Sequence, residues 1–254
     1  FIPMLLGFGC TVPAIMASRA LENERDRYKV MLVTPFMSCN ARLTIYILFA
    51  EMFFGDNAMV VAYSMYLIGI VVAIVVSAII HLLDRKKSVN YLMIELPEYK
   101  LPDSRTVAIY VWEKVKDYLG KAGTTIFIAT IGHWIAPFFA PVGLGFWQIA
   151  VALIAGISAK EVVVSSCAVL FGIVNASSPE GMVEFSAALG SIGFGSLNAL
   201  CLMVFCLLYI PCTATLATIR RESSTRYMLV TAAFQLAVAW VVTLLVYQIG
   251  RLVI

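Results

Sequence analysis

Charged residues are scarce in this chain. Only 13% of its 254 residues are Asp, Glu, Lys or Arg, whereas 61% are hydrophobic and the mean hydropathy is +0.92. Soluble globular proteins carry roughly 25% charged residues, so this chain lacks the charge needed to cover a water-facing surface. Its long apolar runs lack period-2 alternation, which argues against a membrane β-barrel. The composition therefore predicts an all-α, polytopic membrane protein with room for about six to eight spans.

Several motifs of enzymatic chemistry are also absent. The sequence contains no GxxxxGK[ST] phosphate loop, no HExxH and no CxxC, so it offers no site for nucleotide hydrolysis and no closed zinc site. We therefore expect no enzymatic activity in this chain. The net charge of +3 is too small to indicate nucleic-acid binding. The chain begins with Phe1 and has no signal peptide, which we interpret as a fragment of a longer polypeptide.

The basic residues mark one side of the membrane. Of 18 Lys and Arg residues, 15 fall within 19–29, 84–121 and 220–226, and the positive-inside rule places these stretches in the cytoplasm. The segments 140–147 and 175–195 contain no Lys or Arg, which places them outside. The segment between those two must then enter and leave on the same side. It is predicted to be a re-entrant hairpin.

Apolar segments are either smooth or interrupted by Gly, Pro and polar residues. The smooth ones are predicted to span the membrane as single helices, and the interrupted ones to form broken spans or hairpins. In chain order, the expected elements are half a hairpin in 1–18, a broken span in 29–54, a plain span in 58–83, a helix in the cytoplasmic interface in 104–121, a crossing in 122–139, a hairpin in 148–174 folded at 158–161, a span in 196–219 broken at 211–212, and a plain span in 227–250.

The order hairpin, broken span, hairpin, broken span predicts two inverted repeats. We expect a first gate repeat in 1–83, a cytoplasmic loop with an interfacial helix in 84–121, and a second gate repeat in 122–254. Paired interrupted segments in the two halves of a membrane protein point to a transporter's binding site near the bilayer midplane. The breaks are therefore the first places to look for functional residues.

Six cysteines lie in apolar segments and are predicted to be free thiols. Three of them stand at breaks, and thiol sulfur suits Fe(II), Cu(I) and Zn(II) better than Mg(II) or Ca(II). The other three are expected to be packing residues. The predicted ligands at the breaks are Cys10, Cys39 and Cys212, with Met37 and Ser38 as weaker donors and Ser158 and Thr213 as supporting residues; the predicted packing cysteines are Cys167, Cys201 and Cys206.

Charged and titratable side chains at membrane depth are functional candidates. Glu161 is a candidate oxygen ligand or proton carrier, and Lys160 is expected to neutralise it when the site is empty; alternatively both are solvated at the interface. Arg42 is expected to neutralise helix ends at the break or to pair with Glu51. His133 has no spaced partner and is read as a packing residue rather than a ligand.

Several stretches together resemble the membrane domain of the FeoB family of bacterial ferrous iron transporters. The resemblance runs from residue 1 to about residue 250 and rests on 7–15, 21–27, 35–43, 159–163, and 209–212 with 220–222. One departure is Thr11, where the family usually has Asn. The family's gate regions are similar to those of nucleoside transporters, in keeping with the repeats predicted above.

The resemblance implies Fe(II) as the transported substrate and no permanently bound cofactor. It favours Cys10, Cys39, Cys212 and Glu161 as residues of the ion path. It further implies a location in the bacterial inner membrane and a cytoplasmic GTP-binding domain elsewhere in the same polypeptide, where GTP would bind. Small accessory Feo proteins and a homo-oligomer are further partners that the resemblance leaves open.

Two other functions stay open at this point. One is transport of a nucleoside or another organic solute, in which polar residues of the hairpins would bind hydroxyls and bases. The other is a membrane anchor for a GTPase that transports nothing. The placement of three cysteines at breaks favours a metal over an organic solute.

Overall fold

The computed structural model describes residues 2–21, 23–83, 125–173 and 178–253, and all regular elements within these ranges are helices. The predicted interfacial helix and cytoplasmic loop in 84–121 lie outside the described residues. The α-helices are α1 (Ile2–Gly7), α2 (Thr11–Ala17), α3 (Glu24–Val33), α4 (Asn40–Phe54), α5 (Ala58–Leu83), α7 (Thr125–Phe139), α8 (Trp147–Gly156), α9 (Val162–Leu170), α10 (Pro179–Ser191), α11 (Ser196–Leu208), α12 (Thr213–Glu222) and α13 (Thr225–Val253).

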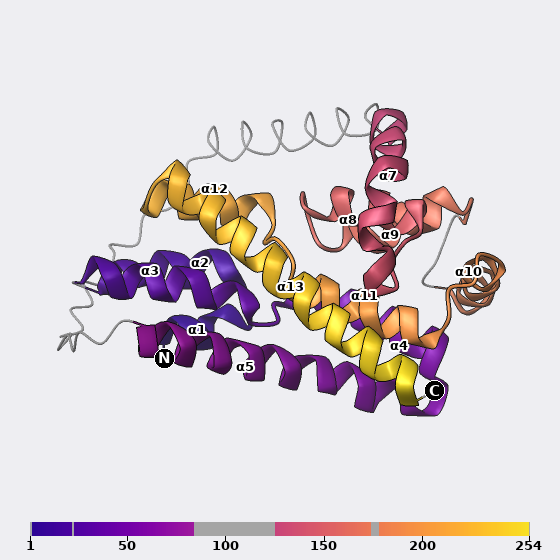
Figure 1. Ribbon diagram of the computed structural model, residues 1–254, viewed down its shortest axis with the longest axis horizontal. Helices are drawn as coiled ribbons and strands as arrows, with labels where there is room; N and C mark the ends of the chain where they lie inside the picture. The colour runs from indigo at the N-terminus through magenta and orange to yellow at the C-terminus, as the bar shows by residue number, and fades with distance from the viewer. Residues whose placement is uncertain (1, 22, 84–124, 174–177, 254) are drawn as a thin grey trace, which may run out of the picture.

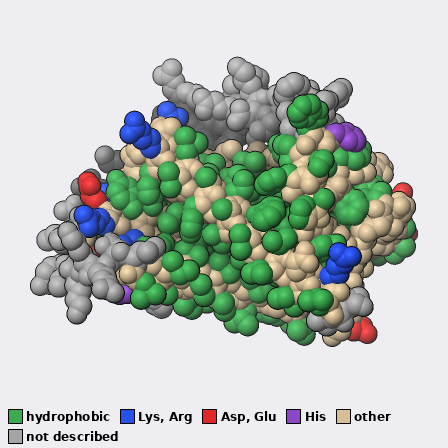
Figure 2. All heavy atoms as spheres, in the orientation of Figure 1, with side chains coloured by type: hydrophobic (Ala, Val, Ile, Leu, Met, Phe, Trp, Pro, Cys, Tyr) green, Lys and Arg blue, Asp and Glu red, His purple; other side chains and the backbone are tan. Residues whose placement is uncertain are grey.

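Three helical stretches are long and apolar enough to cross a membrane. They are Glu24–Leu82, which comprises α3 to α5, then Ser196–Glu222, which comprises α11 and α12, and finally Thr225–Leu252 in α13. Figure 1 shows α5 and α13 as the two longest helices, and Figure 2 shows hydrophobic side chains over the middle of the molecule, with most basic side chains at the end where α3 and α12 lie. The described residues therefore form a multi-pass helical membrane protein.

The breaks occur where the sequence predicts them. In the first broken span, α3 continues into a 3₁₀ turn, η2 (Thr34–Phe36), and the chain is extended at Met37 and Cys39 before α4 begins. In the second, α11 ends at Leu208 and α12 begins at Thr213. Pro35 and Pro211 stand at these breaks because proline has no backbone N–H with which to continue a helix.

Two short helix pairs fold back next to the broken spans. Helices α1 and α2 pack together and turn at residues 8–10, and α8 and α9 pack together and turn at residues 157–161. The second turn lies where the sequence predicts a hairpin to fold, at 158–161, whereas its entry and exit on one side of the membrane stay a prediction. The order of elements therefore matches the predicted hairpin and broken span in each half, whereas the inverted relation between the halves stays a prediction.

Three helices differ from the sequence-based expectation. Helix α3 begins at Glu24, capped by the side chain of Asn23, so it starts five residues before the broken span expected in 29–54. Helix α10 was not expected; the Ser178 side chain caps it and Pro179 is its first residue, a start signal that the sequence contains. Helix α7 is described from Thr125, and its second half forms a bent pair with α8, in which Gly132–Val142 and Trp147–Gly156 meet at 100°.

Helix α11 lies at the centre of the fold. Almost every residue from Ala199 to Leu208 is buried, and the helix contacts α4, α5 and α13. A helix that is apolar on all sides is buried either among other helices or in the bilayer, and α11 lies among other helices. Because α11 ends at the second break, its central position brings that break into the protein interior.

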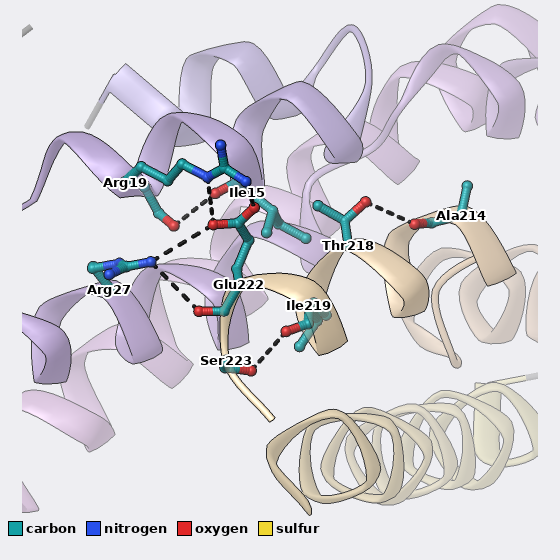
Figure 3. Close-up of polar contacts among 9 residues, drawn as sticks. Ile15, Arg19, Arg27, Ala214, Thr218, Ile219, Glu222 and Ser223 are labelled. Atoms are coloured by element: carbon teal, nitrogen blue, oxygen red, sulfur yellow. Dashed lines mark hydrogen bonds and ion pairs between the residues drawn. The ribbon is translucent and has the colours of Figure 1, made fainter. Parts of the chain in front are cut away.

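The two halves of the chain meet at Glu222 (Figure 3). Its carboxylate pairs with the guanidinium groups of Arg19, which follows α2, and Arg27 in α3, and Arg19 Nε donates to Glu222 Oε2 at 2.6 Å. The hydrogen bond and the charge of Glu222 raise the pKa of Arg19 above its ordinary value. The Arg19 guanidinium therefore stays charged throughout the physiological pH range. Beneath this cluster, Ile15, Met31 and Ile219 form a small apolar core.

Replacing Glu222 by Gln is expected to lower the thermal midpoint of unfolding. The Glu222 side chain is only 4% exposed and pairs with two guanidinium groups, so water cannot easily take over these interactions in the variant. The decrease in thermal midpoint relative to the wild type should be smaller at about 1 M KCl than at about 0.05 M KCl, because salt screens the partly exposed arginines. An equal loss at both salt concentrations would contradict the electrostatic explanation. Arg220→Gln, at an exposed site on the same helix, is the control.

Candidate functional site

The four strongest predicted ligands share one structural position. Cys10, Cys39, Cys212 and Glu161 are the N-cap residues of α2, α4, α12 and α9, respectively. None of the four side chains accepts a hydrogen bond from a backbone N–H in the first turn of its own helix, although the Cys212 thiol and the Thr215 hydroxyl lie 3.2 Å apart. The three thiols are therefore not used in capping. Cys39 and Cys212 are partly exposed and Cys10 is exposed, so all three are accessible to a small ligand.

Backbone hydrogen bonds join each break to the hairpin of its own half. Asn40 N–H, which follows Cys39, donates to Gly9 O at 3.4 Å, and Gly9 directly precedes Cys10. Thr213 N–H, which follows Cys212, donates to Ile157 O at 3.0 Å, and the Thr213 hydroxyl donates to Ser158 O at 3.2 Å. The fold therefore brings Cys10 next to Cys39, and Cys212 next to Ser158.

The two halves are joined through α2 and α12. Ile15 and Ile219 pack in the same small core, and Arg19 contacts Glu222 where both helices end. Cys10 precedes Arg19 by nine residues, and Cys212 precedes Glu222 by ten. Since helices rise about 1.5 Å per residue, the two helices begin at nearly the same level. The cysteines at their starts therefore lie at one depth.

Two buried cations stabilise the breaks. Arg42 is 1% exposed and donates to Met37 O at 2.8 Å and to Pro35 O at 3.0 Å. Lys160 is 3% exposed and donates to Cys206 O at 3.2 Å and to Tyr209 O at 3.4 Å, where α11 ends. Each side chain satisfies carbonyl groups that a terminated helix leaves without partners, at the negative end of the helix dipole.

These contacts distinguish between the roles expected of the two cations. Arg42 binds the helix end at the break, and no ion pair between Arg42 and Glu51 occurs among the described residues. Lys160 also binds a helix end and lies 3.6 Å from the centroid of the Tyr209 ring, whereas Glu161 is exposed. The expected Lys160–Glu161 pair is therefore replaced by Lys160 contacts with carbonyls, because the ends of α11 and the second hairpin meet.

Ionisable side chains from both halves lie near one another at the breaks. Lys160 is close enough to Arg42, Cys39, Cys206 and Cys212 for charge on any of them to act on it. A divalent cation that enters here approaches the Arg42 guanidinium and the Lys160 amine, which also repels it when protonated. Neutral donors alone would not offset that repulsion, whereas thiolates would. The arrangement therefore favours a cation only together with deprotonated cysteines.

Other predicted site residues have structural partners. The Ser38 hydroxyl and the Tyr46 hydroxyl lie 3.2 Å apart, and the Ser158 hydroxyl donates to Ala155 O at 2.7 Å. Met37 is buried. His133 stacks on Trp147, with ring centroids 4.7 Å apart, as expected of a packing residue. No group of three or more His, Cys, Asp or Glu side chains in the described ranges lies close enough to hold a metal ion.

The aromatic residues at the breaks were missed by sequence reasoning. Tyr46 lies beside Ser38, and Tyr209 lies beneath Lys160. Tyr209 stands two residues before Pro211 at the end of α11, so the sequence indicates that it lies at the break but not what its ring contacts. Its ring contact depends on Lys160, 49 residues away, so no local pattern could have predicted it.

Gly156→Ala is expected to destabilise the second hairpin. A Cβ at Gly156 would lie 2.2 Å from Val163 Cγ2 and 2.5 Å from the Tyr209 hydroxyl oxygen, so α8 and α9 would have to separate. Overpacking of this kind costs about 1–3 kcal/mol of unfolding free energy. The matched control is Gly190→Ala in α10, where a Cβ meets nothing within 4 Å and alanine should raise stability by up to about 1 kcal/mol. Thermal unfolding in detergent measures both, and equal midpoints would contradict the close approach.

Comparison with known proteins agrees with this architecture. Residues 1–53 match the family described as "Nucleoside recognition" gate, and residues 62–114 match "Ferrous iron transport protein B C terminus". The chain is 38% identical over 278 residues to the Fe(2+) transporter FeoB of Staphylococcus aureus (strain COL), and 37% identical over 284 residues to that of Methanocaldococcus jannaschii. No solved structure matches the chain.

The coverage of these alignments is asymmetric. Each includes 99% of this chain but 41% of the relative's length, so the chain spans about two fifths of the curated relatives it matches. A third relative, the Fe(2+) transport protein A/Fe(2+) transporter FeoB fusion protein of Porphyromonas gingivalis, is 33% identical, with 38% of its length covered. The matches include both hairpins and both broken spans. Over nearly its whole length the chain is therefore similar to one part of the FeoB proteins.

Proposed function

We propose that this chain forms the ion path of a ferrous iron transporter in the bacterial inner membrane. The observation that carries the proposal is the placement of Cys10, Cys39 and Cys212 at helix N-caps, on backbone segments that connect the hairpins and the broken spans. Thiolates suit Fe(II), whereas oxygen-only sites suit Mg(II) and Ca(II). The matched relatives are named as Fe(2+) transporters, which supports the same substrate.

The coordination we propose is partial. The described residues contain no cluster of three ligating side chains, so an ion at the breaks would bind one or two thiolates and retain several waters. Incomplete coordination suits transport, because an ion must leave as readily as it binds. Thiols lose a proton when they bind a metal, so binding is coupled to proton release. Glu161 is exposed beside Lys160 and is proposed as an oxygen ligand or proton acceptor during passage.

The organisation of the full protein is part of the proposal. We propose that 1–83 and 122–254 act as two inverted gate repeats, that 84–121 connects them on the cytoplasmic side, and that a GTP-binding domain of the same polypeptide regulates them. The P. gingivalis relative, whose name joins a second Fe(2+) transport protein to FeoB, supports association with small accessory Feo proteins. The nucleoside-recognition family matched by 1–53 keeps an organic-solute transporter as the second candidate function.

Uptake by reconstituted full-length protein tests the proposal. Proteoliposomes are loaded with an Fe(II) chelator, and entry of Fe(II), kept reduced by ascorbate, is followed with and without GTP on the side of the cytoplasmic domain. We expect saturable Fe(II) entry that excess nucleoside does not inhibit. Entry of radiolabelled nucleoside would support the second candidate, and no entry of either substrate with GTP on the correct side would support a membrane anchor.

A further inference from the structure

The interior face of α13 carries polar side chains that the proposed ion path does not use. Gln235 and Thr243 are 0% exposed and stand eight residues apart, which places them on one side of the helix. Neither the amide oxygen and nitrogen of Gln235 nor the hydroxyl of Thr243 has a hydrogen-bond partner in the described part of the chain. Thr231, one turn before Gln235, is equally buried and lies beside Tyr227.

Gln235 stands at the depth of the second break. Helices α12 and α13 contact each other and are joined by a turn at Ser223 and Ser224. Cys212 lies eleven residues before Ser223, and Gln235 lies eleven residues after Ser224. Because neighbouring helices joined by a short turn run antiparallel with the same rise per residue, the two residues are at the same distance from the turn.

The first break lies at this depth as well. The ring of Phe234, which precedes Gln235, packs edge-on against Phe36 with centroids 6.2 Å apart. Phe36 directly precedes the extended residues Met37–Cys39 of the first break. The turn of α13 that carries Gln235 is therefore next to one break and level with the other.

An unpartnered primary amide in a membrane interior is strongly unfavourable unless water or an ion binds it. The Gln235 amide offers two donor hydrogens and an acceptor oxygen, and the Thr243 hydroxyl offers one donor and an acceptor. Each of these groups can form hydrogen bonds with water. They carry no charge with which to bind a bare cation.

We propose that Gln235 and Thr243 line a water-filled passage beside α13, and that Gln235 binds the water shell of the divalent cation at the depth of Cys212. The second part rests on the proposed function, and the first part does not. In this arrangement the cation keeps part of its hydration while the cysteines replace the rest. Gln235 is thus a positioning residue for a hydrated ion rather than a direct ligand.

Cysteine labelling tests the passage independently of iron. Gln235→Cys in the full-length protein, in native membranes, is treated with a positively charged methanethiosulfonate reagent, and each modified peptide is quantified by mass spectrometry. The control is Leu245→Cys on the lipid-facing side of the same helix, where Leu245 is 54% exposed. Because the reagent reacts with thiolates in water, we expect Gln235→Cys to be labelled at least about tenfold faster. Equal rates at the two positions would overturn the passage.

Substitution by an apolar side chain of similar size tests the contact with the hydrated ion. Gln235→Met is expected to keep or raise the thermal midpoint, because it removes an unsatisfied amide, while Fe(II) uptake falls about tenfold, the equivalent of one lost hydrogen bond of about 1.4 kcal/mol. Gln235→Glu, which keeps an acceptor oxygen, should restore uptake. A stable Gln235→Met variant with wild-type uptake would overturn the role in ion binding.

The two experiments separate this proposal from the proposed function. Rapid labelling of Gln235→Cys in a protein that takes up no Fe(II) would leave the passage standing and reject iron transport. If Gln235→Met does not fold, the labelling result alone decides whether water reaches this depth. Absence of labelling together with normal Fe(II) uptake would reject the passage and leave the ion path at the cysteines.

Discussion

Cys39→Ser and Cys212→Ser are each expected to reduce Fe(II) uptake by at least about tenfold while the protein remains folded. Removing a side chain that only hydrogen-bonds to a metal ligand lowers metal affinity or activity about 10–100-fold. Removing a thiolate that contacts the ion should lower uptake at least as much. Serine has nearly the same shape as cysteine but stays protonated at neutral pH, so it cannot supply the negative charge that offsets Arg42 and Lys160. Neither thiol caps its helix, so stability should change little.

The measurement is Fe(II) uptake by cells that lack other ferrous transporters and express the full-length protein. Cys201→Ser is the matched control, because Cys201 is fully buried within α11, about two turns before that helix ends at the break. It should lower stability slightly and leave uptake per folded molecule unchanged. Wild-type uptake in both Cys39→Ser and Cys212→Ser would falsify the thiol path. A combined Cys39→Ser and Cys212→Ser variant with no further loss would show that the two thiols act on the same ion.

Arg42→Met is expected to cause a large loss of stability. The guanidinium donates to two carbonyls, at Pro35 and Met37, in a site where it is only 1% exposed. Hydrogen bonds from charged donors contribute about 1.5–3 kcal/mol each, and methionine leaves both carbonyls buried without partners. We expect a loss of about 2–4 kcal/mol, measured by thermal or denaturant unfolding in detergent. Arg42→Lys should recover part of it, because an ammonium cannot reproduce the two-pronged geometry of a guanidinium.

Lys160→Met is the corresponding change at the second break. It removes the donor to Cys206 O and Tyr209 O and the cation–π contact with the Tyr209 ring. Its hydrogen bonds, at 3.2 and 3.4 Å, are longer than those of Arg42, so the loss of stability should be the smaller of the two. Arg220→Met, at an exposed position of α12, is the control for both and should change stability by less than about 0.5 kcal/mol. A loss at Arg220 equal to that at Arg42 would contradict the capping role.

The site was predictable where it depends on local chemistry. Cys39 and Cys212 could be placed at breaks because Pro35 and Pro211 stand beside them and proline cannot continue a helix. The hairpin at 158–161 followed from the absence of basic residues on both sides of it, which forces the chain to enter and leave on one face. The start of α10 also carried a local signal, Ser178 before Pro179, that apolar patterning alone overlooked.

The sequence by itself determined the membrane class, the breaks and the cysteines at them, because hydropathy, proline and basic residues act within a few positions along the chain. Only the tertiary structure decided which carbonyls Arg42 and Lys160 cap, that α2 and α12 lie side by side, and that Gln235 is buried at the depth of Cys212. Contacts such as that between Arg19 and Glu222 join residues 203 positions apart. They arise when helices pack, and packing depends on the shapes of whole surfaces rather than on any local pattern.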